Sequence, residues 1–412
     1  MRILYLSQYF FPEQFLNNHL AKALVERGHA VDVVCCVPNY PSGRFFEGYS
    51  NLTRRRDEWS GVDIHRVSTI PRGKRKLQLL LNYLWYPIAA SWRILFLAKP
   101  FDISFVSMPS PLLQGIAGIF ARVVRRVPTV FWVQDIWPDS AIVTLNLRNR
   151  MVVWLLRALC GWIYRQADLV LVQSDGFHQR IKAFGVDESK IFTLPNTAPG
   201  TFTSIEPDDV PKPIRDMIPQ DRRIIMFAGN IGVSQDFETI IAAAELLPAD
   251  CDLLIVIVGS GREEERVRQK VRESGLDHRF LFLGRHPEYL MPAFLACAHA
   301  ALVSLRDEPI FALTVPSKVQ SYLACGKPIV ASIAGEGAAI VRASGAGVAV
   351  EPSNPTALAG AFRAVADMPA SQLDTMAENA RRAYLADYSL DAVTGKLINF
   401  LAAAAKPKRI GG

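Results

Sequence analysis

Short apolar segments alternate with longer amphipathic segments along most of the chain. In the first half, the apolar segments predict buried strands at residues 2–6, 30–36, 103–107, 129–133 and 169–173. The segment between the first two strands predicts a helix that ends at Gly28, because glycine commonly terminates helices. Buried strands that alternate with helices are typical of a parallel α/β sheet.

This pattern stops between residues 194 and 223, where prolines are frequent and apolar periodicity is weak. The interval predicts a linker at 199–222. After it, the pattern predicts strands at 224–227, 253–258, 280–283 and 300–305 and helices at 237–247, 262–274 and 288–297. The chain is therefore predicted to contain two α/β domains, residues 1–198 and 223–388, followed by a helical segment at 389–412.

The segment 302–332 suggests a ligand site. A strand ends at Leu305, a helix begins at Pro316 and Ser317, and Gly326 ends that helix. In parallel α/β sheets, the loop that follows a strand's carboxyl end faces the ligand crevice. The helix start offers unpaired backbone N–H groups to a phosphate, and Lys318 adds a full positive charge. This combination predicts a site for a sugar nucleotide.

Nine segments of the chain carry a family resemblance. They are QYFFPEQ, LVERGHAVDVV, VPNYPSG, VQDIWPDS, LPNT, FAGNIG, LGR, LVSLRDEP and VPSKVQSYLACGKP. In this order they resemble retaining glycosyltransferase family 4, in the branch similar to O-antigen N-acetylfucosaminyl transferases and colanic-acid transferases. The resemblance implies the GT-B fold, two Rossmann-like parallel-sheet domains facing across a cleft. It also implies that the segment 389–412 crosses back to the first domain.

The resemblance further implies a reaction. A sugar would pass from a UDP-sugar to a hydroxyl of a lipid-linked or saccharide acceptor, with retention, during synthesis of a surface polysaccharide. It implies no metal and no cofactor besides the sugar nucleotide. Lys318 and the helix dipole would stabilise the departing diphosphate. Asp135, at a strand's carboxyl end, is the second candidate catalytic residue.

The predicted donor-binding residues follow the strands of the second domain. They are Gly229, Asn230, Gly232, Arg285, Arg306, Ser317, Lys318, Gln320 and Ser321. The glycines would let backbone amides approach a diphosphate, although a simple tight turn is the alternative. Residues 258–261, Val-Gly-Ser-Gly, are predicted to be a structural turn, because the adjacent glutamates would repel a phosphate.

The chain departs from the family at four donor positions. Asn230 and Gln235 stand where most members carry an arginine and a lysine that grip the phosphates. Leu313 and Ser321 stand where two glutamates are usual, the second of which holds the ribose. The neutral Ser321 or Gln320 would make weaker hydrogen bonds than a carboxylate.

The predicted acceptor residues lie in loops of the first domain. They are Glu13, Asn39, Tyr40, Trp137 and Asp139. Trp137 would offer a sugar-stacking face. Two alternatives stay open: residues 38–43 form only a rigid turn, and Asp135 only caps a helix.

The composition indicates a cellular compartment and restricts the binding partners to be expected. The six cysteines lie mostly within apolar segments without metal-ligand spacing, which predicts reduced thiols and a cytoplasmic protein. The amino-terminal segment resembles a buried strand more than a signal peptide. Residues 1–195 carry 24 Lys and Arg against 14 Asp and Glu, so the basic character belongs to the first domain. Without a recognised nucleic-acid motif, an anionic membrane is the expected partner.

Residues 72–101 combine basic and apolar positions. Pro87 and Arg93 argue against a helix that spans the bilayer, since a charge at its centre costs about 2.5–3.5 kcal/mol. The segment instead predicts a peripheral helix, broken near Pro87, at the inner face of the cytoplasmic membrane. The aromatic residues Tyr83, Trp85, Tyr86 and Trp92 would lie among lipid headgroups, and the basic residues Arg72, Lys74, Arg75 and Lys76 on anionic lipid. Residues 148–165, with Trp154 and Trp162, would extend this surface, while an ordinary core helix is the alternative.

Two other functions remain possible from the sequence. A UDP-sugar epimerase of related fold would isomerise the donor without any acceptor. A degenerate, non-catalytic subunit would bind the nucleotide sugar without turnover, as the substituted donor positions would allow.

Overall fold

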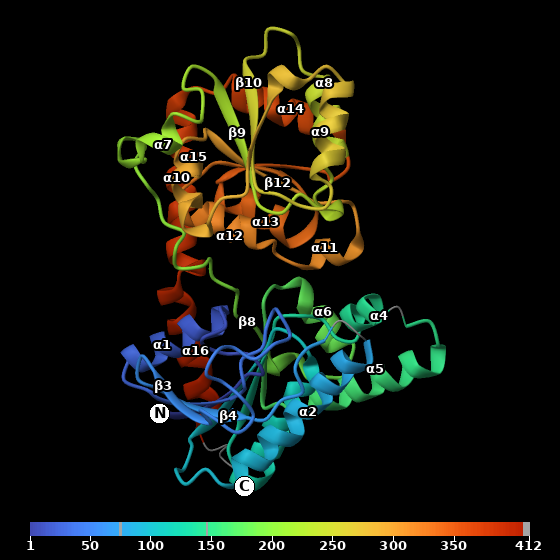
Figure 1. The fold of residues 1–412 in the computed structure, drawn as a ribbon, viewed down its shortest axis with the longest axis vertical. Coiled ribbons are helices and arrows are strands. Elements are labelled where there is room, and N and C mark those ends of the chain that lie inside the picture. Colours follow the sequence, from blue (N-terminus) through green and yellow to red (C-terminus); the bar gives the residue numbers. More distant parts are fainter. Residues whose placement is uncertain (74–75, 146, 407–412) are drawn as a thin grey trace. The chain divides into compact units, whose positions relative to one another are not determined.

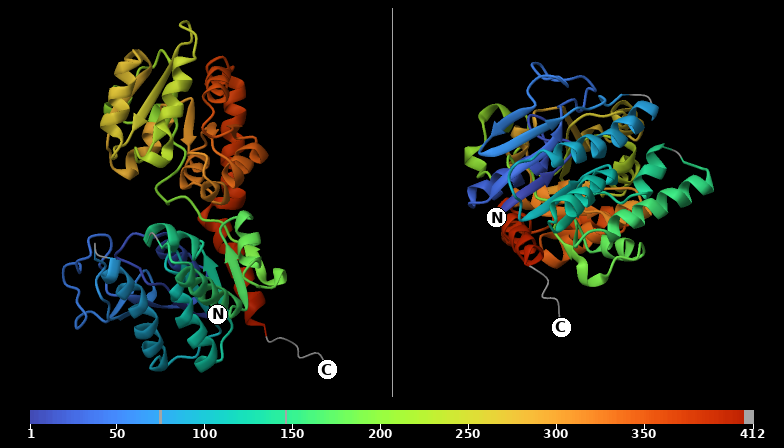
Figure 2. Two further views of the ribbon diagram at one scale, coloured as in Figure 1. Left: turned by 90° about the vertical axis from the view of Figure 1, so that its right-hand side faces the viewer. Right: turned by 90° about the horizontal axis from the view of Figure 1, so that it is seen from below.

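The computed structural model describes residues 1–73, 76–145 and 147–406. Contacts divide the chain into two compact units. One contains Met1–Pro195 and the chain from Val393 onward, and the other contains Asn196–Ala392. Each unit has a central sheet with helices packed on its faces (Figures 1 and 2).

The sheet of the first unit has the order β3-β4-β2-β1-β5-β6-β7-β8. Its strands are β1 (Arg2–Leu6), β2 (Ala30–Cys36), β3 (Arg56–Trp59), β4 (Val62–Val67), β5 (Ile103–Met108), β6 (Thr129–Val133), β7 (Leu169–Val172) and β8 (Ile191–Thr193). Only β3 pairs antiparallel among these strands. The central strands are buried on both faces, which explains why they read as continuous apolar segments.

Helices cover both faces of this sheet. They are α1 (Leu16–Glu26), α2 (Lys76–Leu95), α3 (Gly115–Arg125), α4 (Asp139–Leu145), α5 (Arg150–Arg165), α6 (Gly176–Lys182) and α16 (Leu390–Ala405). The contacts of α16 place the end of the chain with this unit, and Phe400 packs against Phe192 with ring centroids 5.2 Å apart.

The sheet of the second unit is wholly parallel, in the order β11-β10-β9-β12-β13-β14. Its strands are β9 (Arg223–Ala228), β10 (Leu253–Val258), β11 (Phe280–Gly284), β12 (Ala300–Ser304), β13 (Ile329–Ser332) and β14 (Gly347–Val350). Its helices are α7 (Lys212–Arg215), α8 (Phe237–Glu245), α9 (Glu264–Glu273), α10 (Met291–Ala296), α11 (Pro309–Leu313), α12 (Ser317–Ala324), α13 (Gly335–Ser344), α14 (Pro355–Ala366) and α15 (Ala370–Ala383).

Two apolar clusters fill the faces of the second sheet. Met226 of β9 belongs to the cluster that also includes residues of α10, α12 and α13. Its neighbour Phe227 belongs to the opposite cluster, which includes residues of α8, α9 and α14. Successive side chains of a strand point to opposite faces, so β9 contributes to both layers of the core.

The proline-rich interval differs from the predicted linker. Its apolar residues Val210, Ile214 and Ile218 are buried in the core cluster that contains Met226. Exposing these apolar side chains to water would be unfavourable, so residues 207–218 pack onto the second unit.

Helix α2 also corrects a prediction. It is continuous from Lys76 to Leu95 rather than broken near Pro87. The proline removes one backbone hydrogen bond, while the buried residues Tyr86 and Ala90 hold the turns beside it on the sheet. Tyr83 and Tyr86 are buried instead of facing lipid headgroups, and the Tyr86 hydroxyl donates to the Val34 carbonyl at 2.8 Å. Trp85 and Trp92 do face outward.

Candidate functional site

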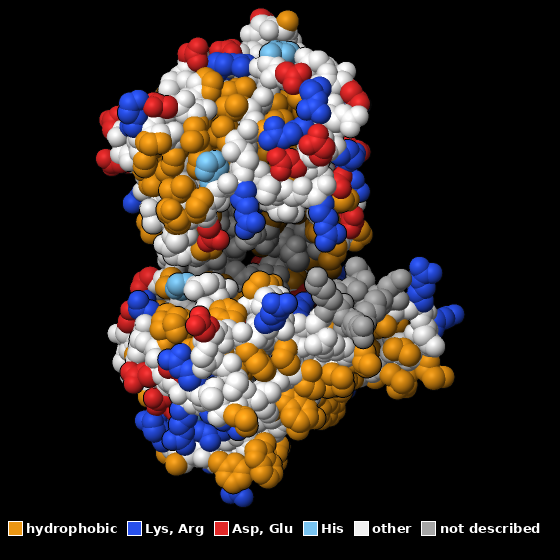
Figure 3. Space-filling view, viewed as in Figure 1, with side chains coloured by type: hydrophobic (Ala, Val, Ile, Leu, Met, Phe, Trp, Pro, Cys, Tyr) orange, Lys and Arg blue, Asp and Glu red, His pale blue; other side chains and the backbone are white. Residues whose placement is uncertain are grey.

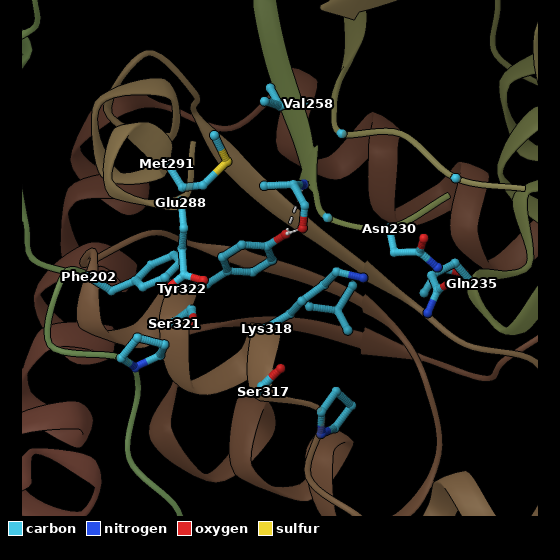
Figure 4. A pocket seen from close by; sticks show the side chains of 18 of the residues that line it. Phe202, Asn230, Gln235, Val258, Glu288, Met291, Ser317, Lys318, Ser321 and Tyr322 are labelled. Carbon is cyan, nitrogen blue, oxygen red and sulfur yellow. Dashed lines mark hydrogen bonds between the residues drawn. The ribbon is translucent and has the colours of Figure 1, made fainter. Parts of the chain in front are cut away.

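A pocket of about 1200 Å³ lies at the carboxyl ends of the central strands of the second unit (Figure 4). Its wall is formed by the loops after β9, β10, β11 and β12 and by the first turns of α12. Parallel strands of a doubly wound sheet bring these loops to one edge, where ligands commonly bind.

Lys318 is the central cation of this pocket. It lies in the first turn of α12, with its Nζ 4.2 Å from the centroid of the Phe227 ring. Among the described residues, no hydrogen bond or ion pair involves this ammonium group. Burial lowers the pKa of Lys318 to about 8. A cation held in this way, beside the open N–H groups of a helix start, provides a site for an anion.

Glycines bring the loops of β9 and β10 into close contact beside Lys318. A Cβ on Gly229 would lie 2.7 Å from Lys318 Cε, and a Cβ on Gly259 would lie 1.8 Å from the Gly229 carbonyl oxygen. A Cβ on Gly261 would overlap the carbonyl oxygen of Ile231 at 2.0 Å. The turn 258–261 therefore has the predicted structural role, and it also lines the pocket.

The structure brings most of the predicted donor residues into this pocket. Those that line it are Gly229, Asn230, Arg285, Ser317, Lys318 and Ser321. In Figure 4 the side chain of Lys318 extends toward the loop that carries Asn230 and Gln235.

Three predicted donor residues do not line the pocket. Arg306 lines a separate pocket with Asp236 and Glu308, because its backbone N–H is bonded to the Ser234 carbonyl. Gln320 is buried, and its Nε2 donates to the Asn196 carbonyl at 3.0 Å. Gly232 adjoins Asn230, but it too lies outside the lining.

Several lining residues were not predicted from the sequence. The Tyr322 hydroxyl accepts from the Ala228 N–H at 3.1 Å, which fixes the end of β9. Ser304 Oγ and Gln235 Oε1 are buried without a hydrogen-bond partner among the described residues. Glu288 is the only carboxylate among the lining residues that the structure describes (Figure 4). For Ser304, the sequence did offer a signal, because this polar residue lies at the end of a buried strand, where ligands commonly bind.

In the first unit, Glu13 and Asn39 correct the predicted acceptor contacts. Both side chains are buried. The Glu13 carboxylate accepts from the backbone N–H groups of Asn39 and Tyr40 at 2.7 and 2.6 Å. Burial raises its pKa to about 7, although these donors oppose the shift. Asn39 Oδ1 accepts from the Arg72 N–H at 2.9 Å, so both residues shape the loop.

Tyr40 remains partly exposed in an aromatic cluster. Its ring contacts those of Tyr9 and Phe15, with centroids 5.5 and 5.2 Å away. The guanidinium of Arg72 lies 5.2 Å from the Tyr40 ring centroid. Arg72, predicted to contact lipid, therefore lies over this cluster. Of the neighbouring basic residues, Lys74 and Arg75 lie outside the described residues, as does the side chain of Lys76.

The loop after β6 carries the candidate catalytic residue Asp135 and the predicted acceptor residues Trp137 and Asp139, which have different surroundings. Burial raises the pKa of the half-buried Asp135 carboxyl, against the opposing influence of Ser140, Ser110 and Trp137. Trp137 is buried, and its ring packs edge-on against Tyr83 at 6.1 Å, so it offers no open stacking face.

Asp139 begins α4, and its carboxylate is paired with two arginine side chains. Its carboxylate forms ion pairs with Arg157 at 3.5 Å and Arg180 at 3.7 Å. These contacts tie α4 to α5 and α6, so the carboxylate predicted to bind acceptor holds helices together. Of the residues predicted on this side, Tyr40, Asp135 and Asp139 keep part of their surface open, although the Asp139 carboxylate is paired with two arginines.

Two family models match successive parts of the chain. Residues 17–197 match the Glycosyl transferase 4-like domain, and residues 213–383 match Glycosyl transferases group 1. The chain belongs to the family 4 glycosyltransferases. It is thus an enzyme of the glycosyltransferase class with the GT-B fold, as the resemblance implied.

Curated relatives agree with this assignment. The chain is 26% identical over 371 residues to the putative colanic acid biosynthesis glycosyl transferase WcaI of Escherichia coli, covering 86% of this chain and 88% of WcaI. It is 28% identical over 253 residues to the probable glycosyltransferase WbjE of Pseudomonas aeruginosa. That match spans 59% of this chain and 61% of WbjE, less than two thirds of its length.

Solved structures share the fold. HepE of Anabaena, in complex with UDP and glucose, has a TM-score of 0.68 and 16% identity, covering 98% of this chain and all of HepE. WaaG, a glycosyltransferase involved in lipopolysaccharide biosynthesis, has a TM-score of 0.62 and 14% identity, covering 97% of this chain and 99% of WaaG. At these identities the likeness concerns the fold.

Proposed function

We propose that this glycosyltransferase moves a sugar from a UDP-sugar to a hydroxyl of a lipid-linked or saccharide acceptor, with retention, in the synthesis of a surface polysaccharide. The observation that carries the proposal is the buried ammonium of Lys318, which has no hydrogen bond or ion pair among the described residues and lines a pocket of about 1200 Å³. The UDP bound in HepE and the description of WcaI as a putative colanic acid biosynthesis glycosyl transferase support the choice of donor and pathway.

In this proposal, the donor is held by charged and by neutral groups of the pocket. Lys318 and the N–H groups that begin α12 would hold the diphosphate. Their positive field would stabilise the charge that grows on the diphosphate as the bond between the sugar and the diphosphate breaks. Asp135 and Tyr40, in the first unit, are the proposed acceptor contacts.

Titration with UDP followed by a donor panel tests this function. UDP should bind. One member of a panel of UDP- and GDP-sugars should release nucleotide when an extract that contains the acceptor is added. Isomerised donor without acceptor would instead indicate an epimerase. Binding without turnover of any donor would indicate a non-catalytic subunit.

UDP affinity should also depend on pH through Lys318. The free lysine is charged mainly below its pKa of about 8, and a bound diphosphate raises that pKa. Affinity should therefore be highest below pH 8 and fall as pH rises from 8 to 9.5, by at most about tenfold per pH unit. Calorimetry across this range checks the prediction, with Lys318→Met as the control in which the dependence disappears. An equal slope in both proteins would contradict it.

We further propose that the first unit contacts an anionic membrane at the cytoplasmic face. No described helix is both long and apolar enough to cross a bilayer. Hydrophobic side chains nevertheless gather on the surface over α2 and α5 (Figure 3). Trp92 of α2 and Trp154 of α5 are 67% and 66% exposed, respectively. Exposed apolar faces with basic flanks are typical of interfacial helices.

Charge placed on α5 should weaken this contact. The double variant Met151→Glu and Trp154→Glu removes two exposed apolar side chains, so its affinity for vesicles rich in phosphatidylglycerol should fall at least tenfold. Sedimentation with vesicles measures the change, and UDP affinity should stay unchanged. The control is Lys270→Glu, an exposed substitution of equal sign in the second unit. Unchanged sedimentation of the double variant would refute the membrane contact.

A further inference from the structure

A separate apolar groove of about 790 Å³ lies in the first unit between α2 and α3. One wall includes Trp85, Ile88 and Trp92 of α2, and the other includes Ile116 and Phe120 of α3. The groove shares Trp92 with the membrane contact proposed above, but none of the proposed donor or acceptor residues lines it.

The lining of the groove is almost entirely apolar. Ile88 is 63% exposed, although a soluble surface usually keeps such residues scattered. The indole N–H of Trp85 donates to Ser68 Oγ at 3.2 Å, which orients the ring and uses one of the few polar groups present. A peptide would therefore find few partners here for its backbone N–H and C=O groups.

Uncompensated positive charge borders the groove. Arg55 lines it, and Arg54 and Arg56 are exposed beside Arg55 in the chain. Among the described residues, neither Arg55 nor Arg56 forms an ion pair. Both lie near Arg93 of α2, whose pKa is lowered first by burial and then by their charges. A second copy of the chain would bring these like charges together, which disfavours self-association through this face.

We propose that the groove binds the hydrocarbon chain of a phosphate-bearing lipid, with the phosphate held by Arg55 and Arg56. Apolar walls match the chain, and the unpaired guanidinium groups match a phosphate. This inference rests on the proposed function in one respect: the lipid is identified with the carrier of a lipid-linked acceptor.

Decyl phosphate, used below its micellar concentration, tests the groove without vesicles. It should bind the protein at a molar ratio near one, as measured by calorimetry and by tryptophan fluorescence. Ala89→Phe, which fills the groove from a lining position, should weaken binding at least tenfold, and so should the pair Arg55→Gln and Arg56→Gln. Leu81→Phe is the matched control on the exposed surface of α2 outside the groove, and it should bind normally.

The outcomes separate this proposal from the donor site. All variants should keep wild-type UDP affinity, which also shows that they fold, and Ser91→Phe provides a second groove-filling variant. Binding that survives both filling variants, binding of decanol as tight as that of decyl phosphate, or dimerisation on addition of decyl phosphate would overturn the groove assignment. Absence of UDP binding in the wild type would instead overturn the proposed donor and leave the groove result intact.

Discussion

Replacing Lys318 by methionine should weaken UDP binding roughly 10- to 150-fold, since a hydrogen bond to a charged group contributes about 1.5–3 kcal/mol. Methionine keeps a flexible apolar stem over Phe227 and removes only the charge. In the free enzyme, this ammonium is desolvated without an anionic partner among the described residues. Its removal should therefore leave the unfolding temperature unchanged or raise it.

Opposite changes in binding and stability distinguish a ligand-binding lysine from a structural one. Calorimetry with UDP and thermal unfolding at pH 7 measure the two quantities. Lys270→Met, an exposed lysine on α9, is the control and should change neither. A clear loss of stability with unchanged UDP affinity would show that Lys318 supports the fold rather than the phosphate.

The strands at the centre of both sheets could be predicted from apolar pattern alone. β1, β2, β6 and β10 have the predicted bounds, because strands buried on both faces need apolar residues throughout. The edge strand β3 was missed because its sequence RDEW is charged. β4 was missed for a related reason: charged residues interrupt its apolar positions, and its buried Arg66 is paired with Asp57 of β3.

The residues that line the pocket of the second unit were predicted better than the exposed residues of the first unit, for a physical reason. Lys318 and Ser317 begin a helix, and a helix start offers open N–H groups wherever it lies. The carboxylate of Glu13 has no such fixed role. It is used inside the protein, where it accepts backbone N–H groups of the Asn39 loop. Sequence shows that a polar residue follows a strand but not whether a neighbouring loop already occupies it.

Helix geometry explains the remaining differences near the donor pocket. Gln320 and Ser321 are adjacent in α12, yet Ser321 lines the pocket and Gln320 bonds to the Asn196 carbonyl. One residue along a helix turns the side chain by about 100°. Asn230 and Gln235 in the facing loop are neutral, so Lys318 and Arg285 are the lysine and arginine of the described lining. The proposed diphosphate site thus depends on these cations and on backbone amides.

Substitution of Gly259 by alanine should abolish UDP binding through the backbone rather than through charge. Gly259 has φ of 149°, which residues with a side chain rarely adopt, and its Cβ would lie 1.8 Å from the Gly229 carbonyl oxygen. The same glycine donates its N–H to the Gly284 carbonyl at 2.7 Å, and the Gly229 N–H donates to the Val258 carbonyl at 2.9 Å. A Cβ at position 259 would therefore push the loop of β10 away from the loop of β9, and the shift would disturb the hydrogen bond to Gly284 of β11.

Strain and overlap together should cost about 3 kcal/mol or more of unfolding free energy. Urea unfolding and UDP titration measure the effect. Gly275→Ala is the matched control, since Gly275 also has positive φ, at 66°, but a Cβ there would have no atom within 4 Å. It should lose only about 1 kcal/mol and keep UDP affinity. Equal effects of the two substitutions would mean that φ alone matters, and that close contact between the glycine loops does not build the donor pocket.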